Sequence, residues 1–350
     1  MTSKDRIINA MKFKKVDYIP VMCKKRAVAP QTIGRKYDRE FQLDPEAMAK
    51  SAIEIWKIVK DDAFCLGAGP AIQMGLGCDL NWPEDDHPSL KNPVITTKEE
   101  ALKLEVPDIY SNEYMSAFIE AVRLLYKWAG DEVPIKIASY GIFNILSRLL
   151  GVERMMQWII KDRETIQLLC DKINETMLKF AKEMRKEGAL IYEIGDAMSG
   201  PALISPQIFK ELSVPNHKAQ IDGFKEMGYL TMLHVCGGEY PVIDQLQYTN
   251  ADFLWFSELV DLSVAQKIFY KRFAVCGGVH PVDTLFVGGP EDVDRDIKEL
   301  ISGLKHKSGV IIMPGCGLSS NISIENLKAM AQATQKYSEL AGKKVLTINN

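Results

Sequence analysis

The chain has 350 residues, of which 47% are hydrophobic and 25% are charged, a composition typical of globular proteins. A formal net charge of −3 gives no electrostatic basis for binding nucleic acid. The first 15 residues lack the apolar core of a signal peptide, and no uncharged apolar run approaches the roughly 18 residues of a membrane span. Seven cysteines, an odd number, fit a reducing cytosol better than a disulfide framework. We therefore expect a cytoplasmic protein that binds neither nucleic acid nor membrane.

Short apolar runs alternate with helical patterns along the chain, after an amphipathic helix at residues 3–15. Eight runs are predicted to be strands, at residues 17–23, 63–67, 133–140, 189–196, 229–234, 251–257, 273–279 and 310–313. Helices are predicted between and after them, at residues 44–60, 112–129, 142–150, 153–160, 163–187, 205–227, 241–246, 262–270, 291–305 and 323–341. Because buried parallel strands have continuous apolar sequences, these repeats predict an α/β fold, a single (β/α)8 TIM barrel domain over residues 1–350 with an N-terminal helical extension.

Residues 68–107 interrupt this pattern after the second predicted strand. They are rich in Gly, Pro and Asp and predict an insertion that forms a hairpin or a long loop, often a lid or a binding loop. An open doubly wound sheet is the competing fold. No glycine-rich phosphate-binding sequence follows an early strand, which disfavours a nucleotide-binding sheet.

Residues 229–238 read YLTMLHVCGG, an apolar run that ends in His234 and Cys236. Because residues i and i+2 of a strand point to the same side, this imidazole and this thiol should emerge together, and the two glycines let the backbone turn away. A similar run, residues 308–318 (SGVIIMPGCGL), places Cys316 past the eighth strand. The carboxyl ends of all barrel strands meet at one face. One nitrogen and two sulfurs suit zinc and leave a fourth coordination position open.

Further polar residues should reach the same face of the barrel. The candidates for catalysis are Asp196 and Glu193, and those for substrate binding are Tyr140, Glu258, His280, Lys24 and Arg26. Either carboxyl group could act in catalysis by protonating or positioning a leaving oxygen. Alternatively, its role could be structural, either capping the following loop or orienting a basic side chain. The basic residues could hold an anionic substrate group or lie in a solvated loop.

Several other chemically distinctive residues have simpler interpretations. Small buried hydrophobic side chains are expected at Cys65, Cys170 and Cys276. The core is expected to include two aromatic residues of the sixth predicted strand, Trp255 and Phe256. Three histidines are expected to be solvated, namely His87, His217 and His306.

Over nearly its whole length the chain resembles the uroporphyrinogen decarboxylase superfamily and, within it, the zinc-dependent corrinoid methyltransferases. The resemblance rests on residues 17–21 (DYIPV), 195–196 (GD) with 203–206 (LISP), 233–237 (LHVCG) and 315–317 (GCG). The methyltransferase branch is marked by an H-x-C…C zinc set, matched here by His234, Cys236 and Cys316. The arginine-rich signature of the decarboxylases after the first strand is missing, because residues 23–28 read CKKRAV. Porphyrinogen decarboxylation is therefore rejected as the main function.

The resemblance implies two cofactors, a Zn²⁺ ion on these three residues and a cobalt corrinoid supplied by a separate corrinoid protein. It also implies a small-molecule methyl donor or acceptor, and it leaves a homodimer open. Zinc in such a site either binds a thiol and favours its thiolate, or withdraws charge from an ether oxygen.

Three functions remain open at this point. The first is O-demethylation, in which a methylated substrate, with a methoxylated aromatic preferred, gives its methyl group to the Co(I) corrinoid of the partner; Trp82, Tyr140 and Phe143 would then line an apolar pocket. The alternative is methyl transfer from a methyl-corrinoid protein to coenzyme M or another thiol, with Lys24 and Arg26 available for the sulfonate. The third is a zinc-binding, decarboxylase-like barrel without methyl transfer.

Overall fold

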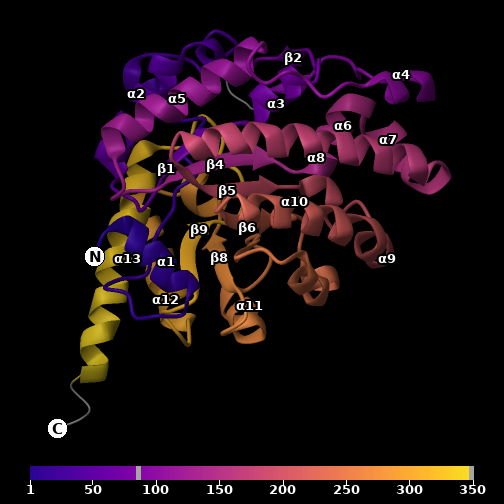
Figure 1. The fold of residues 1–350 in the computed structure, drawn as a ribbon. Helices are drawn as coiled ribbons and strands as arrows, with labels where there is room; N and C mark the ends of the chain where they lie inside the picture. Colours follow the sequence, from indigo (N-terminus) through magenta and orange to yellow (C-terminus); the bar gives the residue numbers. More distant parts are fainter. Residues whose placement is uncertain (84–87, 347–350) are drawn as a thin grey trace.

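A curled sheet of seven parallel strands forms the centre of the computed structural model, which describes residues 1–83 and 88–346 (Figure 1). The strands follow one another in the order β1-β4-β5-β6-β7-β8-β9. Their bounds are β1 (Phe64–Gly67), β4 (Ile135–Tyr140), β5 (Ala189–Gly195), β6 (Leu230–His234), β7 (Phe253–Phe256), β8 (Ala274–Val279) and β9 (Val310–Pro314). They coincide with the second to eighth predicted strands, which confirms the α/β barrel class.

The first predicted strand, residues 17–23, forms only an isolated bridge between Val21 and Ile312 of β9. On that side the backbone still pairs, since Met22 N donates to Ile312 O and Ile312 N donates to Pro20 O. On the side of β1, the Val21 and Cys23 amides donate instead to the carboxylates of Asp62 and Asp61, at 2.9 and 2.7 Å. On this side only one backbone bond remains, from Asp62 N to Val21 O at 2.9 Å, and side chains replace the rest of the ladder, which is why the prediction of a full strand here is wrong.

Helices surround the curled sheet and connect its strands (Figure 1). The α-helices are α1 (Ser3–Met11), α2 (Pro45–Val59), α3 (Gly69–Gly75), α4 (Lys98–Lys103), α5 (Glu113–Ala129), α6 (Ile142–Leu150), α7 (Val152–Lys161), α8 (Arg163–Lys186), α9 (Pro206–Ile208), α10 (Val214–Glu226), α11 (Leu262–Phe269), α12 (Pro290–Gly303) and α13 (Ile324–Leu346). Shorter helical turns are η1 (Ala29–Ile33), η2 (Phe41–Leu43), η3 (Ala197–Ser199), η4 (Phe209–Ser213), η5 (Tyr240–Thr249) and η6 (Asp283–Val287). Among the described residues, no helix is both long and apolar enough to cross a bilayer.

Local sequence signals explain most of the helix boundaries. Asp44 caps α2 by accepting from Ala47 N, with Pro45 in the first turn as predicted. The single helix expected at residues 205–227 is instead divided, because the π-helical turn η4 separates α9 from α10. Pro215 lies just past this turn and has no N–H for an α-helical bond, which accounts for the break.

The insertion at residues 68–107 contains more structure than a loop. Its predicted hairpin is present as the antiparallel pair β2 (Leu80–Asn81) and β3 (Ser89–Leu90). Helices α3 and α4 were not predicted. The signal for α4 was a capping box, in which Thr97 and Glu100 bond to each other's backbone.

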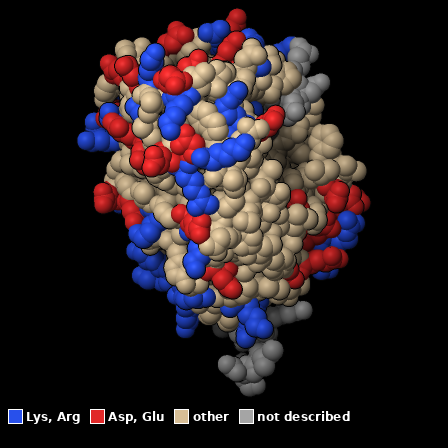
Figure 2. All heavy atoms as spheres, turned by 90° about the vertical axis from the view of Figure 1, so that its right-hand side faces the viewer, with Lys and Arg blue, Asp and Glu red and all other residues tan. Residues whose placement is uncertain are grey.

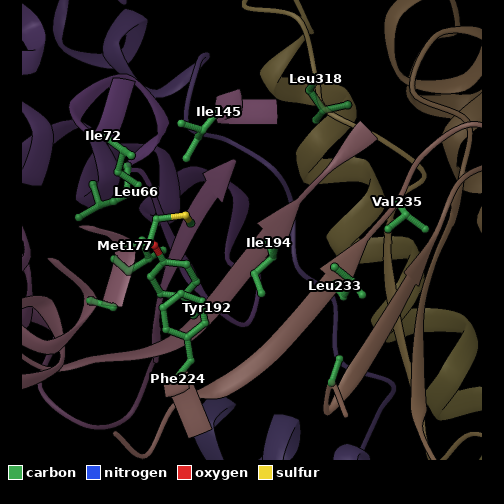
Figure 3. Packing of buried hydrophobic residues seen from close by; sticks show 14 of the residues in the cluster. Leu66, Ile72, Ile145, Met177, Tyr192, Ile194, Phe224, Leu233, Val235 and Leu318 are labelled. Carbon is green, nitrogen blue, oxygen red and sulfur yellow. The ribbon is translucent and has the colours of Figure 1, made fainter. Parts of the chain in front are cut away.

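Residues of the strands alternate between the barrel interior and the surrounding helices. The interior holds apolar side chains two residues apart, such as Ile311 and Met313 of β9, and Ile7 of α1 belongs to the same cluster. The outer face packs on helices, as where Tyr192 of β5 stacks on Phe224 of α10 at 3.9 Å between ring centroids (Figure 3). The same alternation carries His234 inward, two residues after the interior residue Met232.

Candidate metal centre at the carboxyl ends of the strands

His234, Cys236 and Cys316 come together where β6 and β9 end. One ligand atom from each lies within 4.8 Å of the other two, and the two sulfur atoms are 3.5 Å apart. Gly237 and Gly238 follow with φ of +105° and +76°, so the chain turns away as expected through conformations that favour glycine. Residues separated by 80 positions thus form one cluster because both loops leave the same end of the sheet.

The imidazole of His234 is held by one of its two nitrogens. Its Nδ1 donates to the carbonyl oxygen of Trp255 at 3.1 Å, and its ring stacks on the Trp255 indole with centroids 4.1 Å apart. A carbonyl only accepts, so Nδ1 carries the proton and Nε2 keeps a free lone pair. This Nε2 atom is buried and has no hydrogen-bond partner among the described residues. Such an orphaned atom beside two thiols fits a metal ion that the fold family implies.

The sulfur atoms of Cys236 and Cys316 lie 3.5 Å apart, and each thiol shifts the pKa of the other. A hydrogen bond from Cys236 lowers the pKa of Cys316 to about 3, helped by His234 and opposed by burial. The same hydrogen bond and burial raise the pKa of Cys236. Burial of the imidazole opposes protonation, but Cys316 and Glu239 outweigh it and raise the pKa of His234. Two sulfurs and one nitrogen at these positions suit zinc, with room for a fourth ligand.

Two residues that the sequence did not mark as functional hold this cluster in place. Trp255 was expected to be core, and it is buried, but it also binds His234 and donates from Nε1 to Pro314 O at 2.8 Å. Glu239 is fully buried, accepts from Ser257 N and Oγ at 2.9 and 2.6 Å, and lies 3.9 Å from His234 Nδ1. The only sequence signal for Glu239 was its position directly after Gly237 and Gly238.

Glu193 lies inside the barrel between two lysines. Its carboxylate is 2.9 Å from Lys24 Nζ and 2.6 Å from Lys136 Nζ, and Lys24 Nζ lies 4.2 Å from the Trp255 ring centroid. Burial alone would raise the pKa of Glu193, but Lys136 and then Lys24 hold it well below its ordinary value. A carboxylate with such a low pKa stays ionised, so these contacts favour positioning Lys24 over proton donation.

Asp196 lies behind the mouth, at the start of α6. It accepts from the backbone amides of Phe143 and Asn144 at 3.1 and 2.7 Å and contacts His217 Nε2 at 2.9 Å. His217 is fully buried, so the prediction that it is solvated is wrong. Its helix α10 packs on β6 and α8, and the Asp196 carboxylate compensates for the lost water. Phe143 makes an edge contact with His217 and is buried there, so it does not line a pocket at the mouth as expected.

Arg26 and Tyr140 lie together near the ends of β1 and β4. The Arg26 guanidinium carbon is 5.5 Å from the Tyr140 ring centroid, and a Cβ on Gly67 would meet the Arg26 side chain at 2.8 Å. Arg26 is only 9% exposed, yet it forms no ion pair with a carboxylate in residues 1–83 and 88–346. A buried guanidinium without an anion is a suitable place for an anionic ligand.

Of the remaining substrate-binding candidates, Glu258 contacts a loop that carries a possible metal ligand, whereas His280 lies at the surface. Glu258 reaches the loop of Cys316, where its Oε2 would lie 2.6 Å from a Cβ on Gly315, and Oε2 is buried without a hydrogen-bond partner among the described residues. His280 is half-exposed, lies 3.7 Å from Asp283, and lines a surface hollow with Thr284 and Asp296. His87 lies outside the described residues.

The remaining simple interpretations are mostly confirmed. Cys65, Cys170, Cys276 and Phe256 are buried, whereas His306 is half-buried and stacks on Tyr270 with centroids 3.8 Å apart. The expectation that His306 is solvated is thus wrong in part, because its ring covers an aromatic neighbour.

Comparisons with known proteins connect this geometry to a family. The family model described as "Uroporphyrinogen decarboxylase (URO-D)" matches residues 2–337. The chain is 25% identical to the methylcobamide:CoM methyltransferase MtaA of Methanosarcina barkeri over 96% of its length and 98% of that protein. It is 24% identical to the corresponding MtbA of Methanosarcina acetivorans, with the same coverages. A solved methyltransferase structure from Methanosarcina mazei superposes with a TM-score of 0.87 at 24% identity, covering 96% of this chain and 99% of that one, and shows the same fold.

Proposed function

Because the chain belongs to the uroporphyrinogen decarboxylase family, we propose that it is a corrinoid-dependent methyltransferase that transfers a methyl group from a methylated corrinoid to a thiol. The observation that carries the proposal is the cluster of His234, Cys236 and Cys316, with a buried imidazole nitrogen left free. Relatives whose names include coenzyme M support a thiol acceptor. They favour it over the methoxylated aromatic that the sequence alone suggested first.

The bond changes in this reaction are simple to balance. The acceptor thiol loses its proton to solvent, and its thiolate sulfur attacks the methyl carbon. The new S–CH₃ bond forms as the Co–C bond breaks, and both electrons of that bond stay on cobalt, which passes from methyl-Co(III) to Co(I). A zinc ion bound to His234, Cys236 and Cys316 would supply affinity for the acceptor sulfur and favour its thiolate.

The residues of this chain have distinct tasks in the proposal. Trp255 and Glu239 hold the imidazole so that Nε2 faces the mouth. Glu193 holds the Lys24 ammonium against the Trp255 ring. Asp196 holds the amino terminus of α6 and is a positioning residue for the neighbouring loop. The corrinoid is presented by a separate protein.

Arg26 is proposed to bind an anionic group of the acceptor thiol. It is a buried cation at the mouth without an ion-pair partner among the described residues, and the sulfonate of coenzyme M is an anion that a guanidinium binds through two hydrogen bonds. Lys24 is less available, because Glu193 already pairs with it.

Anaerobic spectroscopy tests the function directly. The zinc-loaded protein is mixed with methylcobalamin and 2-mercaptoethanesulfonate, and we expect loss of methyl-Co(III) absorbance, gain of Co(I) absorbance and a methylated thiol by mass spectrometry. Absence of reaction with any thiol would overturn the proposal, and consumption of Co(I) by an aryl methyl ether would restore O-demethylation.

The acceptor assignment has its own control. Arg26→Met should raise the KM for 2-mercaptoethanesulfonate about 10-fold or more, because a charged hydrogen bond is worth about 1.5–3 kcal/mol. The same variant should leave the KM for uncharged ethanethiol within about twofold. Equal effects on both thiols would contradict an anion site at Arg26.

A further inference from the structure

Three loops at the amino-terminal end of the barrel each place two basic side chains beside one aromatic ring. The loops follow α1, α11 and α12, which lie in the lower part of the molecule in Figure 1, and the last two loops lead into β8 and β9. We call these basic residues the basic surface, which consists of Lys12, Lys14, Lys271, Arg272, Lys305 and Lys307. Because β8 and β9 begin at this end of the sheet, the basic surface lies opposite the three metal-binding candidates.

The rings of Phe13, Tyr270 and His306 hold the three loops together. Phe13 meets Tyr270 edge-on with ring centroids 5.6 Å apart, and Tyr270 stacks on His306 with centroids 3.8 Å apart. Phe13 also packs on the backbone just before β9, since a Cβ on Gly309 would lie 2.1 Å from its ring, and Gly309 N donates to Ala10 O at 3.0 Å. These contacts join segments that are far apart in the sequence, so the basic residues form one surface.

The charges of the basic surface are not neutralised by neighbouring carboxylates. Five of the six side chains are exposed, and Lys307 is half-exposed. None forms an ion pair within residues 1–83 and 88–346, and the hydrogen bonds of Arg272 and Lys307 go only to neutral groups. The loops themselves carry no Asp or Glu, although the whole chain has a net charge of −3.

The face where the strands end differs from the basic surface in its charge pattern. It is the right-hand side of Figure 1, where α6 and α9 follow β4 and β5. Figure 2 turns this side toward the viewer and shows Lys and Arg side chains lying among Asp and Glu side chains in its upper half. Mixed charges of this kind neutralise one another, whereas a surface of one sign attracts ligands of the opposite sign.

Two residues of the three loops adopt a backbone conformation that is unfavourable for them. Phe13 and Lys271 have φ of +55° and +62°, and they are two of the four non-glycine residues with positive φ in the described part of the chain. Glycine adopts this conformation at lower cost, so the geometry of the turn alone does not favour a lysine at position 271. Local strain of this kind clusters at functional segments.

We propose that the basic surface binds an acidic segment of a partner protein. Asp and Glu carboxylates complement an array of unpaired lysines and arginine, and the stacked rings hold the loops in place before the partner arrives. A partner bound at this end leaves the mouth of the barrel open. The inference therefore concerns a second face of the molecule and does not depend on the methyltransferase reaction.

Two other polyanions fit the basic surface less well. A membrane-binding surface combines cations with apolar side chains that enter the lipid, but no large hydrophobic side chain of these loops, all of which the structure describes, is exposed. Single-stranded nucleic acid stacks its bases on free aromatic rings, whereas the three rings here pack against one another. Carboxylates need neither feature.

The test uses the full-length protein, with fluorescent decaglutamate as the probe and anisotropy as the measure of binding. The basic-surface variant removes one lysine from each loop, by Lys14→Gln, Lys271→Gln and Lys305→Gln. The control variant removes the same charge from exposed positions of α2, α4 and η4, by Lys50→Gln, Lys103→Gln and Lys210→Gln. The melting temperature is measured for each protein, so that a loss of binding is not mistaken for a loss of folding.

The basic-surface variant should bind decaglutamate about 10-fold more weakly than the parent at low salt, because three ion pairs with the probe are lost. The control variant should bind within about twofold of the parent. Raising the salt to about 0.15 M should weaken the parent more than the basic-surface variant. Equal losses in the two variants would show an effect of net charge alone and would overturn the proposal, as would absence of binding by the parent.

Lys271→Gly separates binding from folding. Glycine relieves the positive φ at this position, so the melting temperature should stay the same or rise, while the affinity for decaglutamate should fall about twofold. A lower melting temperature with unchanged affinity would show that this lysine supports the loop and not a ligand, against the proposal.

Two further probes identify the class of partner. Phosphatidylglycerol vesicles and a single-stranded oligonucleotide are titrated in the same way. Tighter binding of either one than of decaglutamate, lost in the basic-surface variant, would overturn the acidic segment in favour of lipid or nucleic acid. Methyl transfer from methylcobalamin to a thiol should be equal in the parent and the basic-surface variant, so failure of this inference leaves the proposed function intact.

Discussion

The polar cluster inside the barrel and the donor cluster at its mouth differ in whether their polar groups have partners. Inside, the Glu193 carboxylate lies between the ammonium groups of Lys24 and Lys136. At the mouth, His234 Nε2 has no hydrogen-bond partner among the described residues, and the sulfur atoms of Cys236 and Cys316 lie 3.5 Å apart. Paired groups hold charge in place, whereas unpaired groups can bind something else. The difference supports the proposal that the chemistry occurs at the mouth and not in the interior.

Glu193→Gln should cause the largest effect by breaking the interior cluster. The neutral amide leaves two buried ammonium groups without their counter-ion, so the free energy of unfolding should fall by about 3–5 kcal/mol. Urea unfolding measures this loss. Glu258→Gln is the matched control and should change stability by less than about 0.5 kcal/mol, because its Oε2 has no partner among the described residues. Equal losses in both variants would refute the contrast between the clusters.

Cys316→Ala should break the donor cluster with a smaller cost to stability. Loss of an ion ligand should weaken zinc binding by more than the roughly 100-fold that loss of an outer partner can cost, as measured by competition with a chelator. Cys276→Ala also removes a thiol but not a donor, since Cys276 is buried in the barrel interior, and it should keep its zinc. A Cys316 variant that binds one zinc ion as tightly as the parent would exclude this site.

Asp196→Asn tests a carboxylate that, like that of Glu193, has partners but lies beside the mouth. The amide can no longer accept from both backbone amides and from His217, so stability should fall by about 1–3 kcal/mol. Turnover should fall less than about tenfold if Asp196 is a positioning residue and more if it donates a proton. Asp261→Asn at the exposed cap of α11 is the control, and it should be nearly neutral because asparagine caps as well as aspartate.

The smallest expected effect is the change in the alkylation rate of Cys316 when the pH of the metal-free protein is lowered. Because the pKa of Cys316 is lowered to about 3, its thiolate predominates at any pH above that value. Alkylation of Cys316 by iodoacetamide, followed by mass spectrometry, should keep nearly the same rate from about pH 8 to pH 5. An ordinary thiol with a pKa near 8.5 would slow about tenfold per pH unit over most of this range. Cys236→Ala removes the largest of the contacts that lower this pKa, so the rate of alkylation should fall more steeply as the pH is lowered.

Strong periodicity made the seven central strands predictable, because parallel strands buried on both faces leave continuous apolar runs. The first strand was not predictable, since the carboxylates of Asp61 and Asp62 take the place of a backbone ladder. The H-x-C spacing indicated His234 and Cys236, and the barrel topology indicated Cys316. His217 was misjudged because a histidine on an amphipathic helix gives no sign of whether a buried carboxylate faces it.

The sequence by itself determined the class of fold, the end of the barrel where polar groups gather, and the three soft donors, because those depend on periodicity and spacing along the chain. Only the tertiary structure decided which donors lack partners, since hydrogen bonds between distant segments satisfy some groups and leave others free. It pairs Glu193 with two lysines, orients His234 through Trp255, and leaves Arg26 without an ion-pair partner among the described residues. Those pairings depend on contacts across the barrel, which no local pattern encodes.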